Sequence, residues 1–248
     1  MKRIRAKSLS LVCWAALVLV CQSTWADGKN LVVYGATGNI GGKIVTEALN
    51  RGYKVTGVSR NPAKFKIDHP SFTGVAGDVT ASHSVADTIV GADAVIVSVH
   101  GKSTVASDTV HAQASAVMIE VCQKLGADAP RVLQVGGATT MSNSRRIMQQ
   151  EITHLPFEAP EGSPMYAMLF GHWIALQNYR DSEIRWSVVT PAGSIKAGDR
   201  TGEFRLDTET AIVDAEGNSR ISEEDFAVAI IDELENPQFI GRRFTVGY

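Results

Sequence analysis

Residues 31–42 read Leu31-Val32-Val33-Tyr34-Gly35-Ala36-Thr37-Gly38-Asn39-Ile40-Gly41-Gly42. The apolar residues predict a buried strand, the glycines a tight turn, and the apolar spacing that follows a helix. Gly35 permits a sharp exit from the strand, Gly38 lets backbone N–H groups approach a ligand, and Gly41 lets the helix pack close to the sheet. A phosphate at such a turn meets unpaired N–H groups and the positive end of the helix dipole. The stretch therefore predicts a dinucleotide-binding turn, although an ordinary strand–turn–helix connection is the alternative.

The end of the next predicted strand, Tyr53–Val58, indicates which dinucleotide would bind. A site for NAD usually carries Asp or Glu there, about 20 residues beyond the glycines, to accept bonds from the ribose 2′-hydroxyl. Arg60 stands there instead, within Ser59-Arg60-Asn61-Pro62. A guanidinium suits a 2′-phosphate through paired, charge-assisted hydrogen bonds. NADP (as NADPH) is therefore the expected cofactor, with a solvated loop arginine as the alternative.

Residues 1–26 have the pattern of a Sec-type signal peptide. Four basic residues within the first seven precede an apolar run from Leu11 to Cys21, which is too short to span a bilayer. Ala26 is a small residue at a suitable cleavage point. We expect cleavage after Ala26, a periplasmic or secreted mature protein, and no stable membrane insertion afterwards. A cytoplasmic protein is the alternative if the segment is retained or misassigned.

Composition and charge limit the class of protein. The 248 residues are 44% apolar and 20% charged, which is ordinary for a soluble globular chain. Loss of residues 1–26 would leave 20 basic and 26 acidic residues, a net charge of −6, so we expect no nucleic-acid partner. Cys122 would then be the one remaining cysteine, and its place in a helical stretch favours a packed core thiol. The chain length suffices for one α/β domain over 27–248.

Apolar strand-like runs alternate with helical patterns along this domain. Further strands are predicted at 72–76, 94–99, 132–135 and 186–189, and helices at 82–89, 109–124 and 164–180. In the long middle helix, Val110, Val117, Val121 and Leu125 are expected to share one face. Short apolar strands alternating with helices predict an α/β fold of the Rossmann-like kind, a doubly wound parallel sheet covered on both sides.

The alternation changes at two places. Residues 138–163 combine Asn, Ser, Pro, Gly and charged residues, which is typical of a substrate loop rather than a linker. Toward the C-terminus we expect a short strand at Ala211–Val213, a helix opened by Ser222 with Asp225 in a capping box, and a last strand at Phe244–Val246. We infer a small C-terminal substrate-side lobe built on the same single domain.

With these motifs in view, the chain resembles the NAD(P)H-binding family of atypical short-chain dehydrogenases. It is most similar to the group named NADH-flavin reductases, which is related to biliverdin reductase B and the NmrA-like proteins. The matching pieces run through nearly the whole mature chain. They are 35–41, 59–62, 77–79, 91–95, 135–138, 198–202, 219–222 and 243–248. The C-terminal pieces are specific to this group, whereas the glycine motif alone is not.

The resemblance implies the site residues, with the cofactor at the carboxyl ends of the strands. Gly35, Thr37 and Gly41 belong to the glycine turn, and Gly38, Asn39 and Ile40 would face the pyrophosphate. Arg60 would face the 2′-phosphate, and Asp78 and Val79 would flank the adenine. The ribose would be lined by Val97, Ser98 and Val99, and the nicotinamide would lie near Gly136 and Gly137.

Two departures from the family pattern concern the catalytic residues. The short-chain dehydrogenase acid is a Tyr followed four residues later by a Lys, whereas Tyr166 is followed by Phe170. Relatives tend to have a serine where this chain has Thr139-Thr140, either of which could supply a hydroxyl. Carbonyl reduction by a Tyr–Lys pair is therefore not supported.

Tyr166 and His172 remain as candidate catalytic residues on one helix. His172 resembles the helix histidine of biliverdin reductase B, with a locally bonded structural histidine as the alternative, and Tyr166 is equally a packing or substrate-wall residue. The other histidines (69, 83, 100, 111 and 154) lack the spacing of metal ligands, so no metal is expected.

These features favour an NAD(P)H-dependent oxidoreductase that reduces a flavin, FMN or FAD, or a small quinone-like acceptor. Hydride transfer of this kind requires mainly orientation and a dry pocket from the protein. A non-catalytic NADP-binding sensor of the NmrA kind is the alternative, and an isomerase or epimerase with a tightly held cofactor is a third. A Sec-exported chain crosses the membrane unfolded and without cofactor, and soluble NADPH is expected to be scarce outside the cytosol. The partner is a small molecule in each case, and the sequence predicts no oligomeric state.

Overall fold

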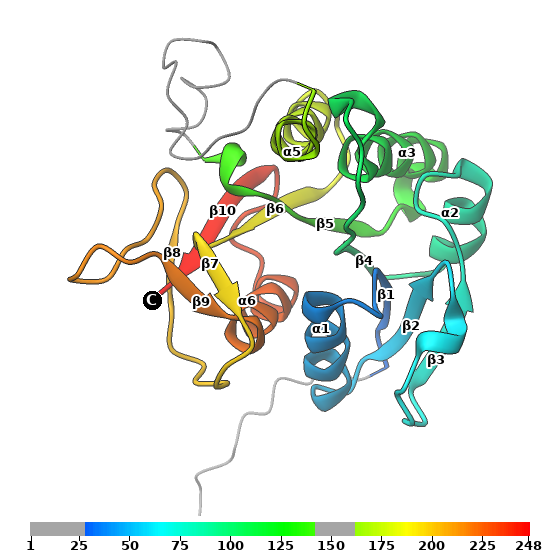
Figure 1. Cartoon of the computed structure of the whole chain (residues 1–248). Helices are drawn as coiled ribbons and strands as arrows, with labels where there is room; N and C mark the ends of the chain where they lie inside the picture. Colours follow the sequence, from blue (N-terminus) through cyan, green and yellow to red (C-terminus); the bar gives the residue numbers. More distant parts are fainter. Residues whose placement is uncertain (1–27, 142–161) are drawn as a thin grey trace, which may run out of the picture.

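The structure is a computed structural model that describes residues 28–141 and 162–248 (Figure 1). The predicted signal peptide 1–26, its cleavage point, and most of the predicted substrate loop 138–163 lie outside the described residues.

An eight-stranded sheet with the order β3-β2-β1-β4-β5-β6-β10-β8 forms the centre of the molecule. Its strands are β1 (Asn30–Tyr34), β2 (Lys54–Ser59), β3 (Phe72–Ala76), β4 (Ala94–Val97), β5 (Arg131–Val135), β6 (Trp186–Pro191), β8 (Arg205–Asp207) and β10 (Arg242–Gly247). All neighbours pair in parallel except the edge strand β8, which is antiparallel to β10. The chain order reverses between β1 and β4, where ligands of open α/β sheets bind.

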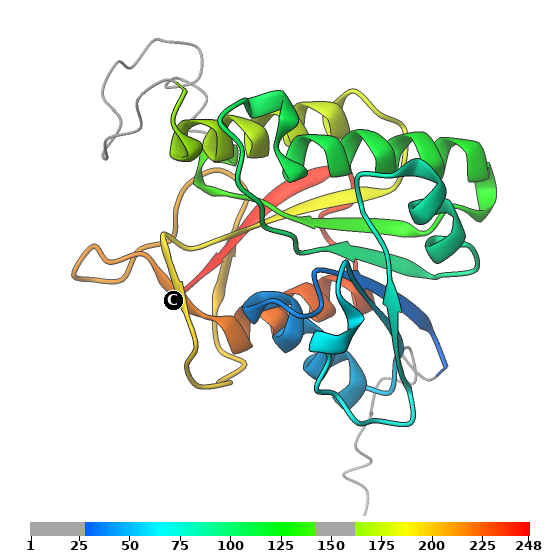
Figure 2. The same ribbon diagram turned by 45° about the vertical axis from the view of Figure 1, so that its right-hand side comes forward.

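Helices cover both faces of this sheet (Figures 1 and 2). One face carries α1 (Asn39–Asn50) and α6 (Glu223–Glu235), and the other carries α2 (Ser82–Ile89), α3 (Val110–Leu125) and α5 (Pro164–Arg180). Alternate residues of β1 belong to two separate apolar cores, Leu31 and Val33 to one and Val32 and Tyr34 to the other. Burial on both faces is why the central strands are continuously apolar in sequence. The predicted doubly wound α/β fold is confirmed.

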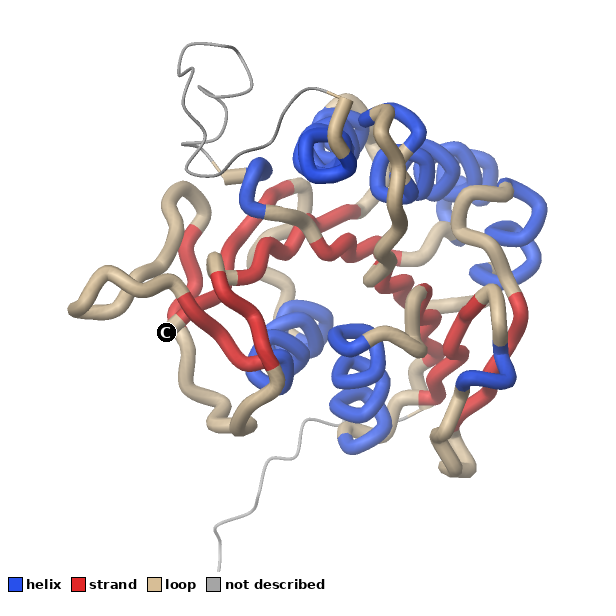
Figure 3. The backbone as a smooth tube through the Cα atoms, in the orientation of Figure 1, coloured by secondary structure: helices blue, strands red, loops and turns tan. Residues whose placement is uncertain are grey.

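The C-terminal lobe is held on the sheet by buried acidic side chains. A small parallel pair, β7 (Ser194–Lys196) and β9 (Arg220–Ser222), leads into α6 (Figure 3). The Ser222 hydroxyl accepts a hydrogen bond from the Asp225 N–H at 2.9 Å, which confirms the predicted cap. The Asp225 carboxylate does not accept from the Ser222 N–H, as a full capping box would require. It accepts from the Thr201 hydroxyl, the Gly202 N–H and the Tyr248 hydroxyl, at 2.5, 2.8 and 2.7 Å.

The same lobe is also joined to α1. The buried Glu47 carboxylate accepts from the Arg51 guanidinium at 2.7 Å and from the Arg200 guanidinium at 2.7 and 2.8 Å. The segment 198–202, one of the pieces that match the family, is therefore fixed against both α1 and α6.

The prediction of a strand at Ala211–Val213 is wrong. These residues have no regular structure, and the edge strand is β8, which precedes them. Two backbone N–H groups, of Glu209 and Thr210, donate to the Asp207 carboxylate and turn the chain away directly after β8. Strands this short are selected by the partner strand rather than by their own apolar content.

The expected face of the middle helix α3 is also partly wrong. Val121 is buried, but Val110, Val117 and Leu125 are only partly so. The buried positions are mainly small or flexible ones, Ala114 and Met118 among them, because α3 packs against both the sheet and α5. The predicted core thiol, Cys122, is buried and unbridged. Within 28–141 and 162–248 no helix is long and apolar enough to cross a bilayer.

Candidate functional site

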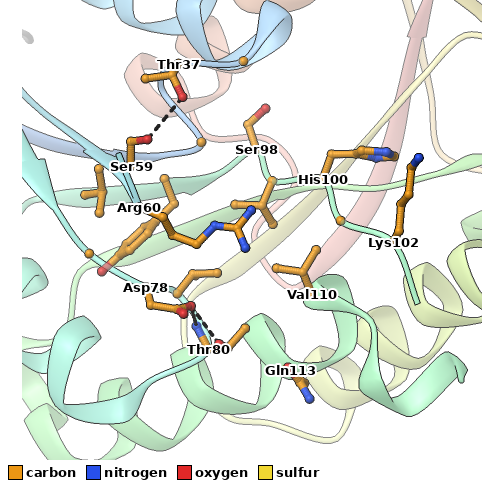
Figure 4. A pocket seen from close by; sticks show the side chains of 18 of the residues that line it. Thr37, Ser59, Arg60, Asp78, Thr80, Ser98, His100, Lys102, Val110 and Gln113 are labelled. Carbon is orange, nitrogen blue, oxygen red and sulfur yellow. Dashed lines mark hydrogen bonds between the residues drawn. The ribbon is translucent and has the colours of Figure 1, made fainter. Parts of the chain in front are cut away.

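A cavity of about 470 Å³ opens at the carboxyl ends of β1 to β4, where the strand order reverses (Figure 4). Parallel strands place the loops that follow them at one edge, so segments far apart in sequence meet there. Its lining combines predicted and unpredicted residues: Tyr34, Gly35, Thr37, Gly38, Val58, Ser59, Arg60, Gly77, Asp78, Val79, Thr80, Ser98, Val99, His100, Gly101, Lys102, Asp108, Val110 and Gln113.

Each glycine of the first turn meets a different constraint. Gly35 has φ +76°, and a Cβ there would lie 2.0 Å from the Ser98 carbonyl oxygen. A Cβ on Gly41 would lie 2.2 Å from the Gly35 carbonyl oxygen. Gly38 is the N-cap of α1 with an extended backbone, and its Cβ would meet only one atom, at 3.2 Å. The absence of a side chain lets Gly35 lie against the backbone of Ser98 and lets Gly41 lie against the backbone of Gly35. Gly38 borders the cavity instead.

The N-terminus of α1 has the features of a phosphate site. Gly38 provides no side chain to cap the helix, so the first-turn N–H groups, which include those of Asn39, Ile40 and Gly41, lack intrahelical partners. No acidic residue lies in that turn to satisfy the helix dipole. Asn39, Ile40 and Gly41 are not among the residues that line the cavity, so we expect any contact from them to come through their backbone N–H groups.

One end of the cavity carries a cation without a bonding partner. Arg60 follows β2, and its guanidinium makes no hydrogen bond or salt bridge within 28–141 and 162–248 (Figure 4). Beside it the hydroxyls of Ser59 and Thr37 are 3.3 Å apart. The Asp78 carboxylate accepts from the backbone N–H and hydroxyl of Thr80 at 2.9 and 2.7 Å, and these bonds hold the pKa of Asp78 below its usual value. The guanidinium remains available for a ligand.

The other end is built by the loop that follows β4. Ser98 and Val99 line the cavity as sequence predicted, whereas Val97 is buried within the sheet and does not. His100 and Lys102 continue the lining and were missed by the sequence analysis (Figure 4). The rule that ligands bind beyond the carboxyl ends of parallel strands was the signal that would have found them.

The remaining predicted residues lie behind this end of the cavity rather than in its lining. Gly136 and Gly137 follow β5, and a Cβ on Gly137 would lie 2.7 Å from the His172 ring. The His172 ring stacks on that of His111, with centroids 3.7 Å apart. Burial lowers the pKa of His111 to about 4 and that of His172 well below its usual value. Both rings are therefore neutral near pH 7.

The hydroxyl groups that sequence suggested as catalytic are either hydrogen-bonded to backbone carbonyls or lie outside the cavity lining. Tyr166 lies near the start of α5 and stacks on Phe170 with ring centroids 4.2 Å apart, outside the cavity lining. The Thr139 hydroxyl donates to the Leu169 carbonyl and the Thr140 hydroxyl to the Gly137 carbonyl, both at 2.6 Å. The catalytic roles of Tyr166 and His172 stay predictions.

Among the described residues no three His, Cys, Asp or Glu side chains gather closely enough to hold a metal ion. The groups that the cavity offers are thus backbone N–H groups, hydroxyls, the cations of Arg60 and Lys102, the His100 imidazole and the carboxylates of Asp78 and Asp108.

A Rossmann-type sheet with a glycine turn and, at its switch point, a cavity that holds an arginine after the second strand defines a dinucleotide-binding protein. The chain matches the NAD(P)H-binding family over residues 35–237, and it belongs to that family.

Solved structures with the same fold include three that are at least a quarter identical to this chain. A protein from Bacteroides thetaiotaomicron, provisionally named an epimerase, is 35% identical, with a TM-score of 0.74 over 90% of this chain and 98% of that one. A Burkholderia pseudomallei protein, provisionally named an exported protein, is 32% identical, with a TM-score of 0.72 over 89% and 100%. A Streptococcus pneumoniae protein, provisionally named an NADH-flavin reductase, is 26% identical, with a TM-score of 0.70 over 89% and 99%.

Proposed function

We propose that the protein is an NADPH-dependent reductase that passes a hydride to a flavin or a small quinone-like acceptor. The observation that carries the proposal is the pairing, in one cavity, of an uncapped helix N-terminus with the Arg60 guanidinium, which makes no hydrogen bond or salt bridge among the described residues. The first suits a pyrophosphate and the second a 2′-phosphate.

The cavity residues fit this cofactor in order along the sheet edge. Arg60 with Ser59 would hold the 2′-phosphate, and the first turn of α1 behind Gly38 would hold the pyrophosphate. When bound, NADPH supplies a hydride from its nicotinamide ring. The protein then has to orient the acceptor against that ring and exclude water.

This chain lacks the Tyr–Lys pair that carbonyl reduction in the family uses. We therefore favour reduction of a conjugated acceptor, which depends less on such groups. Phe170 stands where the lysine of a Tyr–Lys pair would be, and both threonine hydroxyls near Gly137 donate to backbone carbonyls. The name of the S. pneumoniae relative adds support for a flavin. An epimerase, as the B. thetaiotaomicron protein is named, would also need groups that remove and return a proton at carbon.

We also propose that the protein works outside the cytoplasm. The basic start, the short apolar run and Ala26 support export, and so does the name of the B. pseudomallei relative. Such a location would require NADPH to be available there, or the cavity to serve another nucleotide.

The proposal is tested by following NADPH oxidation at 340 nm with purified protein and FMN, FAD or 1,4-naphthoquinone, each corrected for the rate without protein. Oxidation above this background supports the reductase. Tight NADPH binding in calorimetry without oxidation by any acceptor would favour the NmrA-like sensor, and absence of NADPH binding would reject both.

A further inference from the structure

Three histidines from separate parts of the chain form a continuous line from the cavity into the protein. The His100 ring lines the cavity and lies 6.4 Å from the His111 ring, which stacks on His172. His100 follows β4, His111 begins α3, and His172 is in the middle of α5. The line ends at Gly137, after β5.

This line lies at the end of the cavity that the nicotinamide of a bound cofactor would approach. The sheet order runs from β2, which carries Arg60, through β1 and β4 to β5. A dinucleotide with its 2′-phosphate at Arg60 and its pyrophosphate at α1 would extend its other end toward β4 and β5. In Figure 4, His100 and Lys102 lie together, opposite Asp78 and Arg60 across the cavity.

The inner two histidines are unsuited to proton transfer. His111 and His172 are 3% and 9% exposed, and the His111 Nε2 and His172 Nδ1 atoms have no hydrogen-bond partner among the described residues. Protonation of either ring would place a positive charge in a buried stack, which is costly and is consistent with the lowered pKa values of both histidines. They therefore form a neutral wall behind His100.

His100 differs from them in exposure and bonding. Its side chain is exposed, and it makes no hydrogen bond or ion pair within the described residues. Its ring nitrogens are free to bond to a ligand, and an imidazole exchanges its proton between about pH 5 and 8. Lys102 beside it adds a positive charge that would stabilise an anionic oxygen.

We infer that His100 is the proton donor of the reductase, and that its acceptor is a quinone-type conjugated carbonyl compound. The inference rests on the proposed reductase function. Hydride transfer from a bound NADPH to one quinone oxygen would form an O–H bond and leave the other oxygen as an anion. The His100 imidazolium gives that oxygen its proton, so that the hydroquinone, NADP⁺ and neutral imidazole result, and solvent returns the proton to His100. A flavin can leave as an anion after hydride transfer and depends less on such a donor.

The charged groups that face His100 set the form of its pH dependence. Lys102 lies on its own loop, Asp108 precedes α3, and Arg60 and Asp78 line the opposite end of the cavity. The neutral His111 and His172 lie behind it. Because the donor must be protonated, kcat/KM for the quinone is expected to fall toward high pH.

The test compares His100→Gln with His83→Gln, an exposed histidine of α2 outside the cavity lining. With 1,4-naphthoquinone, His100→Gln should lower kcat by about 100-fold or more and remove the decline toward high pH, since general acids contribute about 10²–10⁴-fold. His83→Gln should retain both. Affinity for NADP⁺ in calorimetry should change less than about twofold in either variant, because neither side chain faces the phosphates.

A second readout does not depend on turnover. In ¹⁵N-histidine NMR spectra, NADP⁺ with 1,4-naphthoquinone forms a mixture that cannot react, and the His100 ring signals should shift while those of His83 do not. Normal quinone reduction and an unshifted pH profile in His100→Gln would overturn the inference and leave the reductase standing. Reduction of FMN but no quinone would do the same. A wild type that binds NADPH and reduces nothing would reject the proposed function, and unmoved His100 signals would then reject the ligand contact as well.

Discussion

At Gly38 an added Cβ would make one tight contact, 3.2 Å from the Gly35 carbonyl oxygen, whereas at Gly41 it would lie 2.2 Å from the same oxygen. The two glycines are three residues apart, and a sequence motif does not distinguish them, but they have different structural roles. Gly41 allows α1 to lie on the turn, and Gly38 leaves room for a ligand above the helix N-terminus.

Gly38→Val should therefore abolish NADPH binding while the protein remains folded, because only one contact, at 3.2 Å, has to relax. Gly41→Val is the matched comparison and should lower the melting temperature strongly, since its Cβ would lie 2.2 Å from the Gly35 carbonyl oxygen. Circular dichroism and melting with and without NADPH check both. A folded Gly38→Val protein still stabilised by NADPH would place the phosphate site elsewhere.

Arg60 is the residue on which cofactor preference depends. Arg60→Ala should weaken NADPH binding by about 1.5–3 kcal/mol, the range for hydrogen bonds to charged groups, and leave NADH binding nearly unchanged. The control is Lys64→Ala, an exposed cation four residues on that does not line the cavity. Titration calorimetry with both cofactors measures the difference. Equal affinity of the wild type for NADPH and NADH would contradict the assignment.

At the scale of elements, sequence predicted what depends on periodicity and missed what depends on partners. The predicted strand at 72–76 and the predicted helices at 82–89 and 164–180 have the observed bounds. In α2 the buried residues, Val85 and Ile89, have the helical spacing that packing against the sheet requires. The short strands β7, β8 and β9 were missed, because each exists only by pairing with distant backbone.

The site divides in the same way. The glycine turn and Arg60 follow recognisable strands, so sequence could predict them as site residues, whereas His100 belongs to a loop without a motif. The stack of His111 on His172 joins α3 and α5, which are separated in the chain by β5 and by residues 136–163, so no local sequence pattern predicts it.

This stack should make the α3–α5 contact sensitive to acid. An unfolded histidine binds its proton below about pH 6.5, but folded His111 does so only near pH 4, so the unfolded state holds more protons between these values. Stability is then full above pH 6.5 and falls as pH is lowered, by about 3 kcal/mol at pH 4 from His111, at 1.36 kcal/mol per unit. His172 acts in the same direction.

His111→Phe keeps an aromatic ring against His172 and removes the titrating group. Urea unfolding at a series of pH values should give this variant a shallower loss of stability below pH 6.5 than the wild type. His83→Gln, an exposed substitution on α2, should follow the wild type. Parallel curves for wild type and His111→Phe would show that the buried stack does not control acid stability.

For the whole molecule, the described fold begins where the predicted leader ends. Lys29 accepts the Lys54 N–H through its carbonyl at 2.9 Å, and the Asn30 N–H donates to the Asp93 carboxylate at 2.8 Å. Strand β1 starts at Asn30, so cleavage after Ala26 would leave every described element and the cavity intact.

A chain that starts at Asp27 should therefore melt within about 2 °C of the full chain, less than 1 kcal/mol for a protein of this size, and bind NADPH equally well. A chain that starts at Val32 is the comparison and should be much less stable, because it lacks the Lys29 and Asn30 bonds and the first residues of a central strand. In cells that express the full gene product, N-terminal sequencing of the periplasmic fraction should begin Asp27-Gly28-Lys29. A protein found only in the cytoplasm with Met1 intact would refute export, and would also remove the difficulty of supplying NADPH to a reductase outside the cell membrane.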